Sequence, residues 1–461
     1  DLSGNLLNGT IPSDMADINV YNLNLANNTI FGTIPPSISE SQVRLFDISN
    51  TEMDGPLPDD LGFIFSFKGE SAFVGDIILS PPFRQFSGSL ETIVLSHNKL
   101  ISPPLSSQTF IANDVTSSID YSYGSLVGSL PLTLFGVEME FLNLSGNNLT
   151  SFDFTDFPIT PNRNSFQELY LNDNLFYSAN DFNAFLDTFP YIRTLHARNN
   201  LLSGDVLTIG KIYTDIDLSH NLFSNFSGDF CSDVLRTLLL NDNRLTSFFS
   251  VSEESCLQVM DSLDMSNNLI SSDSFPRFGI IAEVKANYGL KTLRLSNNFL
   301  RMPLSDFEDY PQVSVLDLSN NMIKSTVPAD LLSLHSYELL DFSNNFIFSS
   351  LPKRVNFASF KTLKIGCNLL EGDLPSYVWQ AGILVLDIHN NFFTGSLPST
   401  LPASLVTLDV RNNSLTGVIP TDICNLDSFL GEDNTWFCPL PDCCDTESGS
   451  WTCGSCLPPP S

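Results

Sequence analysis

Several features are scarce in this chain of 461 residues, and each absence removes a class of protein. Only 21 residues are Lys or Arg against 52 Asp and Glu, so the formal net charge is −31. Such a surface repels nucleic acid and anionic lipid, which excludes both as partners, and it favours a protein partner of basic character. No apolar run approaches the roughly 18 residues that cross a bilayer, so this segment is not expected to insert into a membrane.

Catalytic motifs are missing as well. Five His residues provide little acid–base chemistry, and GxSxG, HExxH and GxGxxG strings do not occur. Residues 204–211 resemble a phosphate-binding loop, but the spacing is one residue too long and Ile212 replaces the required Ser or Thr. We therefore predict that the protein is not an enzyme, has no catalytic residue and needs no metal or organic cofactor.

What the chain has in abundance is one short string, L-x-L-x-x-N. Clear copies end at Asn147, Asn298, Asn321 and Asn391. Aligned on the last position, seventeen copies end at 5, 28, 51, 98, 124, 147, 174, 200, 221, 243, 268, 298, 321, 345, 368, 391 and 413. Fifteen carry Asn, with Thr51 and Gly124 as exceptions, and spacings run from 21 to 30 apart from a gap of 47 after Thr51.

This period predicts stacked coils, each with one short strand. The two Leu point inward and the x residues outward, because side chains alternate along a strand. The Asn is expected to turn inward, where its amide satisfies backbone groups of neighbouring coils. The long gap predicts one degenerate coil and an irregular insertion at about 60–90.

A second string, G-x-[IL]-P, begins at Gly9, Gly32, Gly55, Gly128, Gly372, Gly395 and Gly417. With it the chain resembles the extracellular plant-type leucine-rich repeat (LRR) family, which includes receptor ectodomains and polygalacturonase inhibitors. The resemblance implies an α/β-type leucine-rich repeat solenoid of about 17–18 coils. Its parallel β-sheet forms the concave face, and short strands, turns and 3₁₀ segments form the convex face. The middle, from about Phe152 to Phe307, loses G-x-[IL]-P and gains Phe.

Cysteine spacing predicts how the chain is divided. We expect a repeat solenoid over 1–423, a disulfide-rich cap over 424–456 and a Pro-rich tail over 457–461. Six cysteines crowd the expected cap, namely Cys424, Cys438, Cys443, Cys444, Cys453 and Cys456. Structural disulfides are favoured there over a zinc or redox site. Cys231 and Cys256 follow the final Asn of neighbouring repeats at similar offsets, so a disulfide between them is plausible. Cys367 is then left as a free, partly buried thiol.

Six N-x-[ST] sequons add to the signs of secretion. They lie at Asn8, Asn27, Asn143, Asn148, Asn225 and Asn412. An Asn-rich chain produces two or three by chance, so the sequons count only together with the cysteines. Both features favour an extracellular, secreted or cell-surface glycoprotein with N-linked glycans.

The exposed strand face offers two candidate sites. Its central row, the x of L-x-L, is Asp at nine of seventeen positions: Asp1, Asp47, Asp120, Asp217, Asp264, Asp317, Asp341, Asp387 and Asp409. Stacked carboxylates repel one another, which raises their pKa or recruits a cation such as Ca²⁺. Solvated Asp in a common repeat sequence is the favoured interpretation.

The second candidate is the one chemically varied patch of the face, where an aromatic ring, a His and an Arg gather. We predict a binding site at Glu168, Tyr170, Asn172, His196, Arg198, Asp215 and Asp217. The alternative is drift within a repeat array. A glycan at Asn143 would occupy the neighbouring strand and exclude a ligand.

Two functions remain, and both depend on protein–protein contact. The sequence favours a structural component of an extracellular matrix, wall or filament, because the strand face is mostly Ser, Thr and Asp. The sequence also begins within a repeat, so the first coil needs cover, either from upstream residues or from a second copy bound head-to-tail. The alternative is a recognition module, a receptor ectodomain or secreted enzyme inhibitor, that binds a basic protein or peptide on the concave face.

Overall fold

The computed structural model describes the chain except for the following residues: 56, 59–60, 62–63, 75–76, 79–89, 102–116, 133–138, 156–165, 207–211, 227–231, 252–256, 279–288, 334–335, 356–358, 446–450 and 459–461. The chain divides into two units, Asp1–Ser227 and Gly228–Ser461, and each is described by itself.

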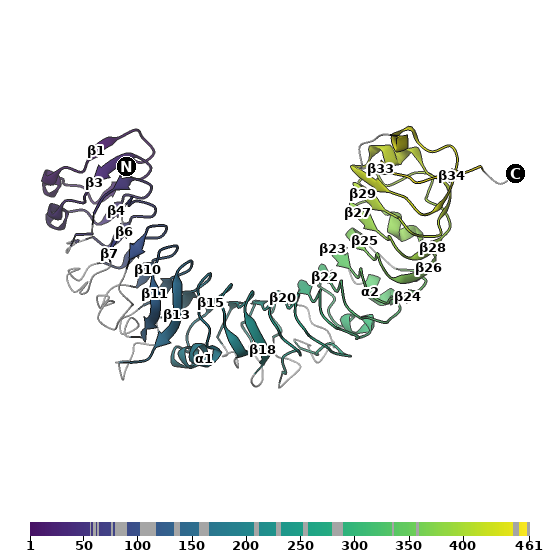
Figure 1. The fold of residues 1–461 in the computed structure, drawn as a ribbon, viewed down its shortest axis with the longest axis horizontal. Coiled ribbons are helices and arrows are strands. Elements are labelled where there is room, and N and C mark those ends of the chain that lie inside the picture. Colours follow the sequence, from purple (N-terminus) through teal and green to yellow (C-terminus); the bar gives the residue numbers. More distant parts are fainter. Residues whose placement is uncertain are drawn as a thin grey trace. The chain divides into compact units, whose positions relative to one another are not determined.

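In the first unit, one short strand from each coil lies beside the strand of the next coil in a parallel sheet (Figure 1). These strands are β2 (Asn22–Asn24), β4 (Leu45–Asp47), β6 (Ser66–Lys68), β8 (Thr92–Val94), β10 (Ser118–Asp120), β12 (Phe141–Asn143), β14 (Glu168–Tyr170), β15 (Thr194–His196) and β17 (Asp215–Asp217). The first Leu of each repeat pairs with its counterpart, as Leu142 does with Leu169 and Leu169 with Leu195. All three are buried, so the repeat spacing fixes the register.

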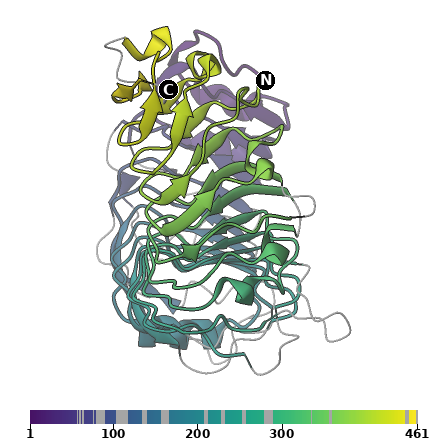
Figure 2. The same ribbon diagram turned by 90° about the vertical axis from the view of Figure 1, so that its right-hand side faces the viewer.

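The second unit has the same arrangement, and Figure 2 shows its parallel strands in green to yellow, one above the other. The strands are β19 (Thr237–Leu239), β20 (Ser262–Asp264), β21 (Thr292–Arg294), β22 (Val315–Asp317), β23 (Ser336–Asp341), β25 (Ser359–Lys364), β27 (Val385–Asp387), β29 (Thr407–Asp409), β31 (Ser428–Leu430) and β33 (Trp451–Thr452). The leucine-rich repeat fold expected from the sequence is confirmed.

A second set of short parallel strands follows the ladder Asn. In the first unit these are β1 (Asn8–Thr10), β3 (Thr29–Gly32), β5 (Glu52–Met53), β7 (Ile77–Ile78), β9 (Leu100–Ile101), β11 (Val127–Pro131), β13 (Asn148–Asp153), β16 (Ser203–Val206) and β18 (Leu222–Phe226). In the second unit they are β24 (Phe348–Ser349), β26 (Leu369–Asp373), β28 (Phe392–Thr394), β30 (Thr416–Val418), β32 (Thr435–Phe437) and β34 (Cys456–Leu457).

The G-x-[IL]-P string explains how the chain leaves these strands. All seven of its Gly residues have φ between 79° and 122°, a region that costs other residues energy. The Pro then holds φ near −65° at the start of a 3₁₀ turn, as before Ser13–Asp17, Ser376–Trp379 and Thr421–Asn425. The chain therefore turns tightly after the string at these three places.

Phe fills the return segments where the string is lost. Helix α1 (Ala179–Thr188) begins after Ser178, whose hydroxyl accepts a hydrogen bond from the Asp181 N–H at 3.2 Å. It packs Phe182 and Phe185 against Phe152, with ring centroids 6.1 and 4.5 Å apart. Helix α2 (Ala329–Ser333) is shorter. Neither α-helix was among the turns and 3₁₀ segments predicted for this face.

The Asn ladder ties each coil to the one before it. The Asn321 oxygen accepts from the Leu300 N–H at 3.0 Å. Its amide nitrogen lies 3.0 Å from the Leu295 carbonyl of the preceding coil and 3.1 Å from the carbonyls of Leu318 and Ser319 in its own coil. The side chain is 7% exposed, so these backbone groups have no access to bulk water.

The gap of 47 residues contains one coil, whose strand is β6. Phe67 and Gly69 replace the Leu pair, and Ala72 stands at the ladder position. Phe67 is fully buried, and a Cβ on Gly69 would lie 3.5 Å from its ring. One large ring thus fills the volume of two smaller side chains. Within the expected insertion at about 60–90, residues 60, 62–63, 75–76 and 79–89 lie outside the described residues.

The segment expected to be a separate cap contains a further coil that sequence reasoning missed. Its strand is β31; Phe429 in the strand and Gly431 directly after it replace the Leu pair. Asn434 completes the ladder, accepting from the Leu415 N–H at 3.0 Å and lying 2.8 Å from the Val410 carbonyl. The fully buried Trp436 donates to the Gly431 carbonyl at 2.7 Å.

Three disulfides cross-link the same segment: Cys424–Cys443, Cys438–Cys456 and Cys444–Cys453. Among the described cysteines, Cys367 is the free thiol. Cys231 and Cys256, for which a bridge was predicted, lie outside the described residues. The described part of the chain contains no helix with the length and apolar character that crossing a membrane requires.

Replacing Asn321 by Ala tests the ladder. The change leaves the Leu300 N–H and the Leu295 carbonyl without their side-chain partner, which should cost about 2–4 kcal/mol of unfolding free energy. Chemical denaturation measures this cost. Lys324→Ala, an exposed position of the same coil, is the control and should change stability by less than about 0.5 kcal/mol. Equal effects of the two changes would contradict the ladder's role.

Candidate functional site

The Asp residues of the central row are held within their own turns. Asp217, Asp264, Asp317 and Asp341 each accept two hydrogen bonds from the Ser two residues later. The N–H donates at 3.0 Å and the hydroxyl at 2.5–2.7 Å. Asp409 instead pairs with Arg411, whose Nη2 lies 2.7 Å away.

The expectation of solvated carboxylates is therefore wrong for part of this row. Asp217, Asp341 and Asp409 are 9%, 8% and 7% exposed. Burial raises the pKa of Asp264 and Asp341, and the neighbouring Asp317 charge adds to both shifts. Desolvation thus exceeds the repulsion between stacked charges that the sequence suggested. Calcium binding at this row stays a hypothesis.

The seven predicted binding residues lie together on β14, β15, β17 and the turns that follow. Tyr170 pairs with His196 and His196 with Asp217 across the sheet. Glu168 lies in register with Thr194, which pairs in turn with Asp215. The parallel register therefore assembles the predicted cluster from three consecutive coils.

Tyr170 is the centre of this cluster. Its ring packs edge-to-face on the His196 imidazole, with centroids 5.0 Å apart, and contacts Phe141 at 5.4 Å on the other side. Its hydroxyl donates to the Glu168 carboxylate at 3.1 Å. Burial, the adjacent Glu168 charge and hydrogen bond, and the Asp215 charge raise the pKa of Tyr170 to about 12, so it remains a hydroxyl donor at neutral pH.

His196 and Asp215 form a loose pair beside it. The His196 Nε2 lies 3.6 Å from the Asp215 carboxylate, beyond hydrogen-bond distance. Within the described part of the chain, this buried nitrogen has no hydrogen-bond partner. The Asp215 side chain is 44% exposed, so its carboxylate remains accessible to a ligand.

Two predicted members serve the framework instead. Asp217 is occupied by Ser219, and the Asn172 oxygen accepts from the Arg198 N–H at 2.9 Å. Sequence reasoning missed His220, whose ring nitrogen lies 3.4 Å from the Arg198 guanidinium. The sequence could have revealed His220, because it occupies the position directly before the ladder Asn221, where most coils carry Asn or Asp. We call Glu168, Tyr170, His196, Arg198, Asp215 and His220 the Tyr170 patch.

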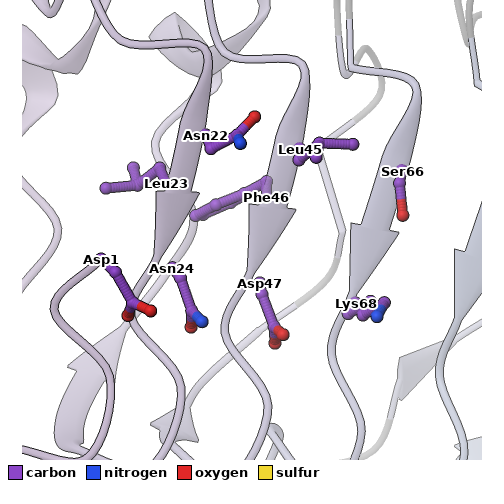
Figure 3. Close-up of a pocket in the computed structure, with 9 residues that line it drawn as sticks. All are labelled: Asp1, Asn22, Leu23, Asn24, Leu45, Phe46, Asp47, Ser66 and Lys68. Atoms are coloured by element: carbon purple, nitrogen blue, oxygen red, sulfur yellow. The ribbon is translucent and has the colours of Figure 1, made fainter.

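A separate hollow lies on the strand face of the first coils (Figure 3). It has a volume of ≈ 300 Å³ and is lined by Asp1, Asn22, Leu23, Asn24, Leu45, Phe46, Asp47, Ser66 and Lys68. Lys68 lies in register with Asp47, so a cation interrupts the acidic row here. The sequence did not reveal this feature because Lys68 belongs to the degenerate coil.

Comparison with known proteins agrees with this geometry. The Leucine Rich Repeat profile matches residues 19–41 and 404–426, one segment in each unit. The Asn ladder and the second set of strands that follows it are found in both units. The chain is a leucine-rich repeat solenoid. No curated protein matches the sequence.

Solved structures share this leucine-rich repeat fold. The Arabidopsis receptor kinase HAESA, solved with the peptide hormone IDA and the co-receptor SERK1, has 22% identity and a TM-score of 0.73, over 98% of this chain and 76% of HAESA. A TDR receptor has 21% identity and a TM-score of 0.73, over 99% of this chain and 84% of the receptor chain. YopM from Yersinia enterocolitica has 18% identity and a TM-score of 0.60, over 92% of this chain and 88% of YopM. Identities this low concern the fold alone, and the fold occurs in plant and bacterial proteins.

Asp341→Asn tests the buried row. Asn keeps an oxygen that can accept from Ser343 and removes the buried charge. Because the folded pKa of Asp341 is raised, its contribution to stability is full at low pH and is lost as pH rises through that pKa. Thermal unfolding should therefore show the variant more stable than the native protein at about pH 7 and equal to it at about pH 3.

Asp341→Ala is the matched comparison, because it loses both acceptor bonds and should cost about 1–3 kcal/mol at either pH. A native protein that is more stable than the Asn variant at neutral pH would show that the Asp341 charge is favourable in place.

Proposed function

We propose that this chain is a recognition module that binds a basic peptide or a basic protein segment on the strand face of its first unit. The Tyr170 patch carries this proposal. It replaces the repetitive Ser, Thr and Asp of the face with an aromatic ring, two imidazoles, a guanidinium and two carboxylates on consecutive coils. Aromatic rings and Arg are the side chains that most often dominate binding energy at interfaces.

The charges of the patch favour a cationic ligand. Glu168 and Asp215 flank Tyr170 and His196, and the chain as a whole carries −31. Lys or Arg side chains of a peptide can pair with these carboxylates while their stems pack on the Tyr170 ring. The ring is held between Phe141 and His196, so it loses little conformational freedom on binding.

The comparisons support protein recognition more than a structural role. HAESA, which shares this fold, is described in complex with a peptide hormone and a co-receptor, and this supports a protein or peptide ligand for the chain. Nothing comparable supports a filament assembled head-to-tail. We therefore infer a non-enzymatic protein-binding module, extracellular or at the cell surface, in line with the three disulfides among the described residues and the six sequons of the sequence.

Tyr170→Ala should abolish most of the binding. The experiment measures, by calorimetry, the affinity of the glycosylated protein for a panel of peptides of about ten residues that differ in Lys and Arg content. Loss of this half-buried aromatic anchor should weaken the binding of a basic ligand by at least about thirtyfold, corresponding to about 2 kcal/mol. Binding should also weaken as salt rises, because the pairing is electrostatic.

Tyr191→Ala is the matched control. Tyr191 belongs to the same unit, is 46% exposed and lies outside the strands of the sheet. It should leave affinity unchanged within about twofold. Equal loss in both variants, or equal affinity for acidic and basic peptides, would reject the proposal.

Glycan mapping provides an independent check. Five of the six sequon residues are exposed, whereas Asn143 is half-buried and pairs in register with Tyr170. We expect no glycan at Asn143 in the secreted protein, because a sugar there would stand beside the Tyr170 ring. Mass spectrometry of tryptic glycopeptides measures occupancy. A fully occupied Asn143 would argue against ligand binding at this patch.

A further inference from the structure

Departures from the common repeat cluster on two neighbouring coils of the second unit. The coil over 316–321 reads L-D-L-S-N-N, which is the common pattern. The coil over 363–368 reads L-K-I-G-C-N and the coil over 386–391 reads L-D-I-H-N-N. Gly366 and His389 thus occupy the usual Ser position, and Cys367 occupies the position before the ladder Asn.

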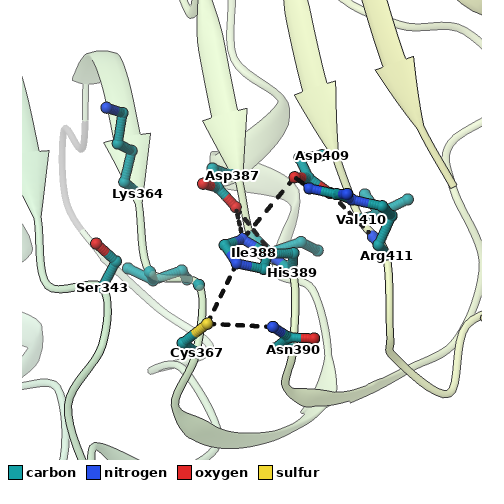
Figure 4. Close-up of polar contacts among 12 residues, drawn as sticks. Ser343, Lys364, Cys367, Asp387, Ile388, His389, Asn390, Asp409, Val410 and Arg411 are labelled. Atoms are coloured by element: carbon teal, nitrogen blue, oxygen red, sulfur yellow. Dashed lines mark hydrogen bonds and ion pairs between the residues drawn. The ribbon is translucent and has the colours of Figure 1, made fainter. Parts of the chain in front are cut away.

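These departures meet in space (Figure 4). The Cys367 Sγ lies 3.2 Å from the His389 Nε2. The opposite ring nitrogen, Nδ1, lies 2.5 Å from the Asp387 carboxylate. The Asn390 amide donates to the same sulfur at 3.2 Å. A thiol, an imidazole and a carboxylate therefore lie in line, in the order that activates a nucleophile.

Gly366 is what allows this arrangement. A Cβ at this position would lie 2.4 Å from the His389 Nδ1, closer than any real contact. The imidazole can therefore lie across the neighbouring coil and reach Cys367 only because the usual Ser is absent there. The absence of a side chain at position 366 and the presence of the imidazole at position 389 therefore depend on one another sterically.

The backbone at Cys367 supports the same conclusion. Its φ is +53°, as in most coils at this position, where Asn and Asp are frequent because they tolerate it. Cysteine has no such preference. A thiol therefore stands where the repeat has a conformational reason to carry Asn, as it does at Asn320 and Asn344.

A metal site is the weaker interpretation of this cluster. Asp387, His389 and Asp409 have ligand atoms within 4.8 Å of one another. However, Arg411 binds both oxygens of Asp409, at 3.0 and 2.7 Å, and its positive charge opposes a cation. The His389 Nδ1 is also already engaged by Asp387, and an ion about 2.1 Å from both atoms would have to separate them.

We propose that Cys367, His389 and Asp387 form a thiol–imidazole–carboxylate relay that makes Cys367 a site of thiol–disulfide exchange with small or peptide disulfides. Cys367 is the nucleophile, His389 accepts and returns its proton, and Asp387 is a positioning residue that holds the imidazole. The relay lies in the second unit and does not depend on the peptide-binding proposal. The described cap cysteines are all in disulfides, which fits a compartment where disulfide substrates are present.

The exchange balances without any further oxidant. The proton of the Cys367 thiol passes to the His389 Nε2, and the thiolate attacks one sulfur of the substrate disulfide. A new sulfur–sulfur bond forms to Cys367 as the substrate bond breaks. The departing thiolate takes the proton from the imidazolium and leaves as a thiol. The Asn390 amide and the imidazolium stabilise the thiolate by hydrogen bonds.

The charged neighbours favour this proton transfer. The hydrogen bond to Asp387 raises the pKa of His389, and the charges of Asp387 and Asp409 act in the same direction. Burial and the Arg411 charge oppose the increase but are smaller in sum. Lys364, which pairs in register with Asp387, is the remaining cation on the adjacent strand β25.

The test measures the rate at which dipyridyl disulfide, a neutral chromogenic reagent, reacts with the glycosylated protein between about pH 4 and pH 9. At about pH 6 an ordinary thiol, with a pKa of about 8.5, is almost fully protonated and reacts slowly. We expect the native protein to react there at least about tenfold faster than His389→Gln, because the native imidazole holds the thiol proton and keeps the thiolate beside it, which Gln cannot do. Mass spectrometry should locate the mixed disulfide at Cys367, and oxidised glutathione should give the corresponding adduct.

Two further variants separate the relay from a fold defect. Cys367→Asn restores the residue that the repeat favours, so it should fold and unfold like the native protein and show no fast reaction. Asp387→Asn should retain labelling of Cys367 at about pH 9 but lose much of the rate advantage at about pH 6. Circular dichroism and thermal unfolding establish that each variant is folded.

A native rate that follows an ordinary thiol across the pH range would overturn the proposal. So would a rate that is unchanged in a folded His389→Gln variant, or a modification that maps to another cysteine.

Discussion

The buried hydrogen bonds of the ladder Asn residues are the constraint on which the remaining structure depends. At Asn321, for example, the side-chain oxygen accepts a hydrogen bond from the preceding coil and the amide nitrogen donates one to it. The amide nitrogen also donates to two carbonyls of its own coil and so closes the turn. Since the amide is buried, these backbone groups cannot exchange it for water. The ladder therefore sets the distance between coils and the point where each strand ends, and it makes stability depend on neighbours.

Because the backbone framework is fixed in this way, the chemistry of the strand face depends on which residue occupies each repeat position. The residue at a given repeat position always lies beside the same position of the next coil, so replacing Ser by His moves an imidazole to a known place. The Tyr170 patch arises from replacements in the central row and its flanks on three consecutive coils. The Cys367 relay arises from replacements at two adjacent positions on two coils.

Sequence periodicity predicted the coils because the buried Leu and Asn positions leave a repeated signal. It missed the coil ending at Asn434 because the Phe429 ring fills the space that the side chain at position 431 would occupy. A search for paired Leu residues does not detect a Phe followed by a Gly. The hydrogen bonds of Asp341 could have been foreseen from the D-x-S spacing, in which Ser donates to a carboxylate two residues earlier. Helix α1 was also foreseeable, since Phe182, Phe185 and Phe189 follow a helical period.

The contacts of the two sites were harder to predict, because they join different repeat positions across coils. The contact between Cys367 and His389 depends on the missing side chain of Gly366, an absence that no search for reactive residues detects. Likewise, the sequence showed that His196 and Tyr170 are neighbours but not that Asn172 and Asp217 are occupied by the framework.

The burial of part of the central Asp row also separates two effects of the large negative charge. Long-range attraction of a basic partner depends on net charge, which hydrogen bonding to Ser does not change. Short-range pairing requires an accessible carboxylate, and Asp217 and Asp341 are too buried to provide one. Asp215 is accessible, and it stands beside an aromatic ring that is already held in place. Salt should therefore reduce the rate of association with any basic partner, whereas discrimination among partners resides in the few coils where the row is interrupted.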